Sequence, residues 1–124
     1  MPRGYEIKMA GEFETLDGSG GAKWLLARRS LGVENFGMNL VRIPAGGSIV
    51  EHDETESGQV EVFAVLEGDG VFEVDGEDHP APAGTWIRMD PEVRRNIHNR
   101  SESELTALLI GCPAETSYEP PGWA

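Results

Sequence analysis

The chain of 124 residues contains one cysteine, Cys112, and only ten basic residues against 22 acidic ones. A single cysteine cannot form an internal disulfide, which is typical of a reducing compartment. The formal net charge of −12 repels phosphate backbones, so we do not expect a nucleic-acid partner. The sequence also lacks an apolar segment of signal-peptide or membrane-spanning length. We therefore expect a cytoplasmic protein with no membrane partner.

The chain also lacks internal repeats and any sustained helical periodicity, whereas turn-forming residues are abundant. Sixteen glycines and eight prolines favour many short strands joined by tight turns. The length is that of one domain. We predict a single all-β domain over residues 1–124, with an irregular N-terminal arm over about 1–22 and an extended tail over about 113–124.

Alternating apolar and polar residues, bounded by turn signals, predict a series of short strands. Asp75-Gly76 is a strong two-residue hairpin signal, and a turn is expected over residues 80–84. Such a series favours a jelly-roll barrel over an α/β fold, with an immunoglobulin-like sandwich as the alternative. The predicted strands cover residues 5–9, 23–29, 37–43, 48–52, 60–67, 71–74, 85–89, 93–99 and 105–110.

One spacing pattern stands out in the middle of the chain. Gly46 is followed after five residues by His52, and Glu61 is followed after six residues by Gly68. This pattern resembles the first motif of the cupins, in which a glycine, His-x-His, a glutamate and a second glycine recur at such distances. The immunoglobulin-like alternative offers no reason for this pattern. The resemblance implies a cupin-like double-stranded β-helix whose motif residues point into the barrel, and it also implies a homodimer.

The second cupin motif can be aligned from Gly84. In that register Asp90 stands at the family's proline, Glu92 at its glycine, Arg95 at its histidine and Asn99 at its asparagine. The first glycine and the asparagine match, but the metal-binding histidine does not. Strand parity supports this register, because alternate residues from 93 to 99 form the more apolar face and should point inward.

The resemblance implies a metal site that this chain retains only in part. His52 stands at the first histidine position, Glu54 at the second, and Glu61 is retained. Arg95 cannot ligate a metal, because its guanidinium stays protonated, and it should instead form paired hydrogen bonds with the carboxylates. We therefore expect no metal cofactor; a divalent transition metal, if present, would be held by His52, Glu54 and Glu61. If the loop insertion precedes Glu54, Glu54 and Glu56 would take the two histidine positions instead.

Several residues have a structural interpretation beside a functional one. His52 could be an ordinary polar strand residue, and Glu61 could face solvent, although the alternation of Glu61, Phe63 and Val65 favours the barrel interior. Trp86 could line the barrel or fill its core, and core filling is the more common role. His79 and His98 lack ligand spacing and should be surface or turn residues. The predicted ligand-binding residues are His52, Glu54, Glu61, Phe63 and Arg95.

Three functional hypotheses follow from these residues. The first is a barrel that binds a small polar or anionic molecule against apolar walls. The second is an enzyme of dioxygenase or isomerase type, either metal-dependent with a reduced ligand set or metal-free with His52 as acid and base. The third is a structural relic without a ligand. The first is preferred, because the histidine of the second motif is lost whereas a histidine and a glutamate remain at motif spacing. Both faces of residues 60–67 are apolar, so the outer face must be covered. The N-terminal arm can cover part of it and a second subunit the remainder, which also favours a homodimer.

Overall fold

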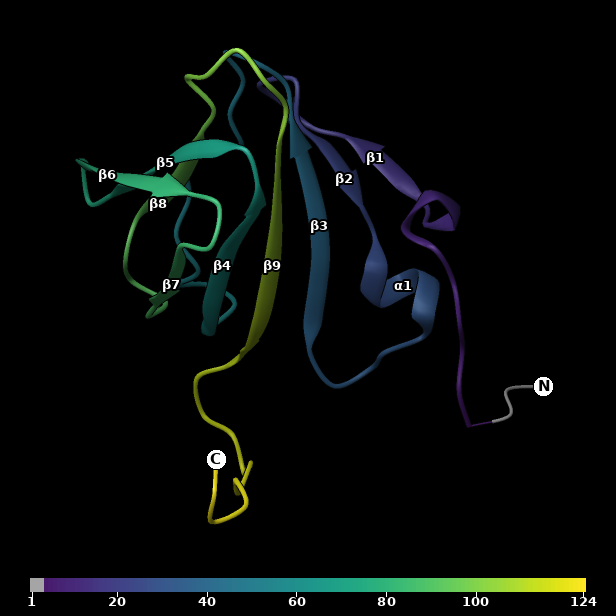
Figure 1. Cartoon of the computed structure of the whole chain (residues 1–124). Coiled ribbons are helices and arrows are strands. Elements are labelled where there is room, and N and C mark those ends of the chain that lie inside the picture. Colours follow the sequence, from purple (N-terminus) through teal and green to yellow (C-terminus); the bar gives the residue numbers. More distant parts are fainter. Residues whose placement is uncertain (1–3) are drawn as a thin grey trace.

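The computed structural model describes residues 4–124 and contains two antiparallel sheets (Figure 1). The larger sheet has the strand order β1-β2-β3-β9-β4-β7, and the smaller has the order β6-β5-β8. The two sheets form a jelly roll, so the predicted all-β fold class is confirmed. The strands are β1 (Thr15–Asp17), β2 (Lys23–Leu25), β3 (Gly37–Ile43), β4 (Gln59–Glu67), β5 (Asp69–Val74), β6 (Glu77–Pro82), β7 (Trp86–Met89), β8 (Arg95–His98) and β9 (Leu105–Pro113).

The core lies between the inner faces of the two sheets. Phe63 on β4 packs edge-on against Phe72 on β5, with 6.4 Å between the ring centroids. Val41, Val65 and Ala107 are fully buried beside them. Along β8 and just beyond it, Arg95, Ile97 and Asn99 are each at most 1% exposed. These three residues therefore lie inside the jelly roll, as the strand parity predicted.

The strand predicted over residues 23–29 is wrong in its second half. β2 ends at Leu25, and a short helix, α1 (Ala27–Leu31), follows. Gly32 caps this helix in the left-handed conformation with φ of 73°, and its N–H donates to the carbonyls of Arg28 and Arg29. Such a glycine cap stops a helix at a defined residue. A five-residue helix is too short to show a helical period in the sequence.

The N-terminal arm also differs from the prediction. Residues 5–9 form no strand; they run extended along the outside of the fold into a single 3-10 turn, η1 (Ala10–Glu12). A strand appears only afterwards, where β1 pairs with β2 in the register Leu16↔Trp24. Alternation of apolar residues predicted the extended backbone but could not supply the neighbouring strand that makes it a sheet.

Two further segments and one residue differ from the prediction. The turn expected over residues 80–84 begins later, because Pro80 and Pro82 belong to β6. Strand β6 lies at a sheet edge, where a proline need not donate to the ladder. Residues 48–52 form isolated bridges at Ser48 and His52 rather than a continuous strand. Trp86 is 61% exposed, so its predicted place in the core is wrong.

The helices in the described part of the chain are all too short or too polar to cross a membrane.

Candidate functional site

The candidate site is built where two segments meet inside the jelly roll. His52 lies in the loop between β3 and β4 and exchanges two backbone hydrogen bonds with Arg95 on β8, at 3.1 and 2.8 Å. Glu61 lies on β4, opposite Met89 on β7 and Gly111 on β9. The backbone pairing therefore fixes the positions of the Cα atoms of His52, Arg95 and Glu61, and their side chains project toward one point.

The side chains of His52, Glu54 and Glu61 form one cluster. The His52 Nε2 atom lies 3.3 Å from Glu61 Oε1 and 3.5 Å from Glu54 Oε1. The other ring nitrogen, Nδ1, lies 2.8 Å from the Val50 carbonyl oxygen. A hydrogen on Nδ1 would donate to that carbonyl and leave Nε2 free to accept a proton or to ligate. The ring is thus held with Nε2 between two carboxylates.

Arg95 lies behind this cluster and is 1% exposed. Its Nη2 donates to the Asp90 carbonyl at 3.1 Å, and its Nε lies 3.8 Å from Glu61 Oε1. Among residues 4–124, Nε and Nη1 have no hydrogen-bond partner. The predicted paired hydrogen bonds from Arg95 to the carboxylates are therefore absent. Arg95 and Glu61 therefore form an ion pair that is too long for a hydrogen bond. Coulomb attraction between the two charges falls off more slowly with distance and still acts.

The electrostatics of the cluster favour a protonated His52. The pKa of the imidazole is raised above its usual value, first by the hydrogen bond with Glu61. Partial burial opposes this shift, whereas the Val50 carbonyl and the negative charges of Glu61 and Glu54 support it. With His52 protonated, the cluster carries one positive and two negative charges, and the buried guanidinium of Arg95 behind it compensates the second carboxylate.

The cluster lines a cavity of about 370 Å³. This volume lies at the lower end of the range for small-molecule sites. The three clustered side chains supply its charged lining, and apolar residues with two side-chain amides supply much of the remainder. These further lining residues include Trp24, Met38, Asn39, Gln59 and Leu109.

The donor set fits a divalent cation in part. One nitrogen or oxygen atom from each of His52, Glu54 and Glu61 lies within 4.8 Å of the other two. An imidazole and two carboxylates suit divalent ions of borderline or hard character. Arg95 at the fourth position cannot ligate. Three residues would therefore hold such an ion, which would supply Lewis acidity at the cavity wall.

Of the other residues named in the sequence analysis, Glu54 lies in the cluster, His98 and Asn99 lie outside it, and Phe63 departs from its predicted place at the site. Glu54, and not Glu56, joins His52 in the cluster. Phe63 is 1% exposed and packs in the core rather than lining the cavity. His98 is turned away and hydrogen-bonds Glu73 at 2.7 Å. Asn99, at the motif asparagine, donates to the Ile43 and Ser103 carbonyls, a structural role that ties the end of β3 to the loop before β9.

The sequence reasoning missed three polar or aromatic cavity residues, Trp24, Asn39 and Gln59. They come from β2, β3 and β4, which are separated in the sequence. For Gln59, a signal was available, because it lies two residues before Glu61 and so shares its strand face. Trp24 and Asn39 carry no spacing relation to the motif, and only the sheet brings them to the site.

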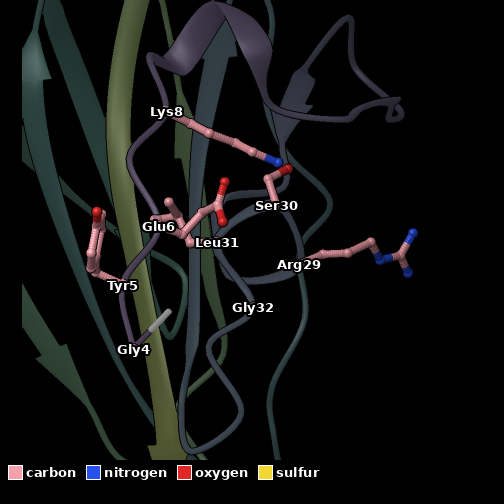
Figure 2. A pocket seen from close by; sticks show the side chains of 8 residues that line it. All are labelled: Gly4, Tyr5, Glu6, Lys8, Arg29, Ser30, Leu31 and Gly32. Carbon is pink, nitrogen blue, oxygen red and sulfur yellow. The ribbon is translucent and has the colours of Figure 1, made fainter. Parts of the chain in front are cut away.

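A second cavity of about 400 Å³ lies between the N-terminal arm and α1 (Figure 2). It is slightly larger than the cavity beside His52. Tyr5 and Arg29 point away from its centre, whereas Glu6 and Lys8 bring opposite charges to it. Its lining contains no group of three metal-donor side chains within the described residues. The cavity beside His52 is therefore the better candidate for a functional site, because its lining contains the cluster of donor side chains.

The fold and the two motifs define a known class of protein. The family model described as "Cupin domain" matches residues 39–111, which is more than half of the chain. The chain therefore belongs to the cupin family. It is also similar to an oxalate-binding protein of Thermotoga maritima, with 30% identity over 70 residues. That match spans 56% of each chain, so it covers little more than half of the relative.

Several solved structures share the fold. A cupin-superfamily sugar phosphate isomerase from Silicibacter pomeroyi has a TM-score of 0.77 at 23% identity, over 88% of this chain and 76% of that one. A cupin protein from Bacteroides fragilis also has a TM-score of 0.77 at 23% identity, over 99% and 94%. A predicted oxalate decarboxylase from Thermotoga maritima has a TM-score of 0.70 at 22% identity, over 87% and 99%. These likenesses establish the fold alone.

Proposed function

We propose that this cupin barrel binds a small polar or anionic molecule in the cavity beside His52, Glu54 and Glu61. The observation that carries the proposal is the convergence of these three side chains on one cavity of about 370 Å³. Apolar lining with a few converging polar groups is the usual composition of a small-molecule site. The relative named for oxalate binding supports an anionic ligand.

Charge decides when an anion can bind. Arg95 lies behind Glu61 and does not line the cavity, so an anion would meet two carboxylates first. Protonation of His52 compensates one of these charges, and the raised pKa of His52 favours that state. An anionic ligand should therefore bind more tightly at acidic pH, whereas a neutral ligand should show a weaker pH dependence.

A thermal-shift screen tests this proposal. Oxalate, other short carboxylates, polyols and amines are each added to the protein after chelator treatment. A ligand raises the unfolding temperature, because it binds the folded state alone. The same ligand should lose its effect in His52→Ala, whereas Thr55→Ala, an exposed neighbour, should behave like the parent. If no compound shifts the parent in the absence or presence of divalent ions, the proposal is wrong.

A second candidate is a metal-dependent cupin enzyme with a reduced ligand set. The three donors within 4.8 Å of one another favour it. Metal analysis by mass spectrometry of protein purified without a histidine tag separates the two candidates. One Fe, Mn, Ni or Zn per chain, lost in His52→Ala and Glu61→Gln, would make the enzyme the better interpretation. Less than about a tenth of an equivalent would support the metal-free binding barrel.

A further inference from the structure

The cavity beside His52 does not end at the cluster. An outer cavity of about 360 Å³ adjoins it, and both cavities are lined by Gly37, Gln59 and Gly111. Arg28, Phe36 and Ser57 line only the outer one. Two cavities that share three lining residues lie next to each other, and together they are called the groove, with an inner part beside His52 and an outer part beside Phe36.

Two glycines and one side chain lie at the boundary between the inner and the outer part. Gly37 on β3 lies opposite Gly111 on β9, and Gly111 lies opposite Glu61 on β4. A Cβ atom at position 111 would collide with Gln59 Oε1. The Gln59 side chain therefore lies over the space that the glycine leaves free. Flexible terminal atoms can move at little cost, so Gln59 can yield to a molecule that enters the groove.

The amides along the groove have unused hydrogen-bonding capacity. Within residues 4–124, the side chains of Gln59 and Asn39 form no hydrogen bond with another protein group, and both residues are only partly exposed. Each amide offers a donor and an acceptor next to each other. A ligand hydroxyl is also donor and acceptor at once, so hydroxyl groups complement these amides without adding charge.

The charges along the groove favour a neutral molecule. The inner part brings two carboxylates, Glu54 and Glu61, beside His52, an arrangement that disfavours an anion. The charged residues of the outer part are Arg28 and Glu34, which have opposite signs. Trp24 and Phe36 add an aromatic side chain to the inner and outer parts respectively. Aromatic rings pack well against the C–H faces of hydroxylated rings while their rims remain polar.

We propose that the groove binds an elongated, neutral, hydroxyl-rich molecule of about two sugar rings, and that Gln59 is the specificity residue between its two subsites. This inference rests on the proposed function and names the ligand class for the same site. The proposed ligand is longer than oxalate, because only a longer molecule reaches from the cluster to Phe36.

Ligand-observed NMR with maltose, cellobiose and glucose as probes tests the inference. At least one disaccharide should bind about tenfold more tightly than glucose, with saturation transferred to both rings. Gln59→Ala should weaken the disaccharide by up to about tenfold, the usual effect of one or two lost hydrogen bonds. Phe36→Ala should weaken the disaccharide and leave glucose unchanged. Glu67→Ala, exposed on the same strand, is the matched control.

Equal binding of glucose and the disaccharides, unaffected by Phe36→Ala, would overturn the two-subsite groove. Failure of all three sugars to bind would overturn the ligand class. Neither failure removes the proposed function, because oxalate or another small polar compound in the thermal-shift screen would still report the inner site. Circular dichroism of each variant separates loss of binding from loss of the fold.

Discussion

The carboxylate of Glu61 is shared between two cations, His52 at 3.3 Å and Arg95 at 3.8 Å. Compared with the cupin motifs that the sequence resembles, Glu54 adds a negative charge and Arg95 adds a positive one. The two replacements cancel, so the formal charge of the four positions is unchanged. Coulomb repulsion from Arg95 is therefore offset locally by Glu54. The charges at the four motif positions are thus redistributed, and their sum is kept.

The first prediction concerns the proton on His52. NMR titration of the parent should give an imidazole pKa above about 6.5. Glu61→Gln should lower it clearly, because the Glu61 hydrogen bond is the largest cause of the upward shift and burial opposes it. Glu54→Gln should have a smaller effect, since its charge is the smallest cause. The interpretation fails if the parent histidine titrates at its ordinary value.

The same shift links stability to pH. A pKa raised in the folded state means that folding favours the protonated histidine. The resulting stabilisation is complete below the unfolded pKa of about 6.5 and is lost as the pH rises through the folded value. The free energy of unfolding of the parent relative to His52→Asn should therefore decrease between pH of about 5.5 and 8.5 in urea titrations. An unchanged difference would mean that protonation and folding are not coupled.

The second prediction concerns Arg95. Arg95→His removes a buried positive charge and places an imidazole at the fourth position of the cluster. We expect this variant to bind Zn²⁺ or Ni²⁺ more tightly than the parent by calorimetry after chelator treatment. Arg94→His, on the exposed side of the same strand region, is the control and should leave affinity unchanged. Equal affinities of Arg95→His and the parent would show that Arg95 does not oppose metal binding.

At the scale of elements, the turn between β4 and β5 fixes the direction of both strands. Gly68 at this turn has φ of 92°, and an added Cβ would lie 2.8 Å from the Glu104 carbonyl oxygen and 2.9 Å from Leu105 Cα. Gly76 in the next hairpin has φ of 82°, but nothing lies within 4 Å of an added Cβ. The two glycines share the same backbone requirement and differ in the space around them.

This pair gives the third prediction. Gly76→Ala should lower the free energy of unfolding by about 1 to 2 kcal/mol, the cost of a side chain in the left-handed region. Gly68→Ala should cost roughly 3 kcal/mol or more, because backbone strain and a clash with rigid backbone atoms add. Chemical denaturation measures both values. Equal losses would mean that the chain near Leu105 relaxes freely, contrary to its burial.

At the scale of the whole molecule, apolar side chains remain on the outside. Tyr5, Ile7 and Met9 on the arm and Leu16 on β1 are all exposed, and β1 is an edge strand of the larger sheet. An edge strand beside an apolar extended segment is a ready surface for a second chain. The homodimer predicted from the sequence used the outer face of β4 together with the N-terminal arm, and the exposed apolar side chains favour the arm and β1.

The fourth prediction is therefore a homodimer that uses the arm and β1. Light scattering should report a dimer at tens of micromolar, a concentration at which interfaces of ordinary affinity are occupied. The double variant Ile7→Ser and Met9→Ser should shift the mass toward a monomer, whereas Val50→Ser, another exposed apolar position, should not. A monomeric parent at this concentration would contradict the prediction.

The fold class and the inward-facing positions follow from local patterns in the sequence. Turn residues and alternating strands predicted the jelly roll, and the spacing of Gly46, His52, Glu61 and Gly68 identified the family. Strand parity placed Arg95 inside and His98 outside, because the two-residue period of a strand leaves only two choices. Local patterns with a fixed period can be read without knowing the partner strand.

Other features depend on which segments lie next to each other in space, and these appear only in the tertiary structure. Residues 5–9 lack the neighbouring strand that their alternation requires, and Trp86 faces outward although its size favoured the core. The choice of Glu54 over Glu56, and the approach of Asn39 and Gln59 to the cluster, depend on how the loop before β4 and the strands β3 and β4 are placed in space. Side-chain convergence is a property of the assembled sheets, because it joins residues whose separation in the sequence carries no information about their distance.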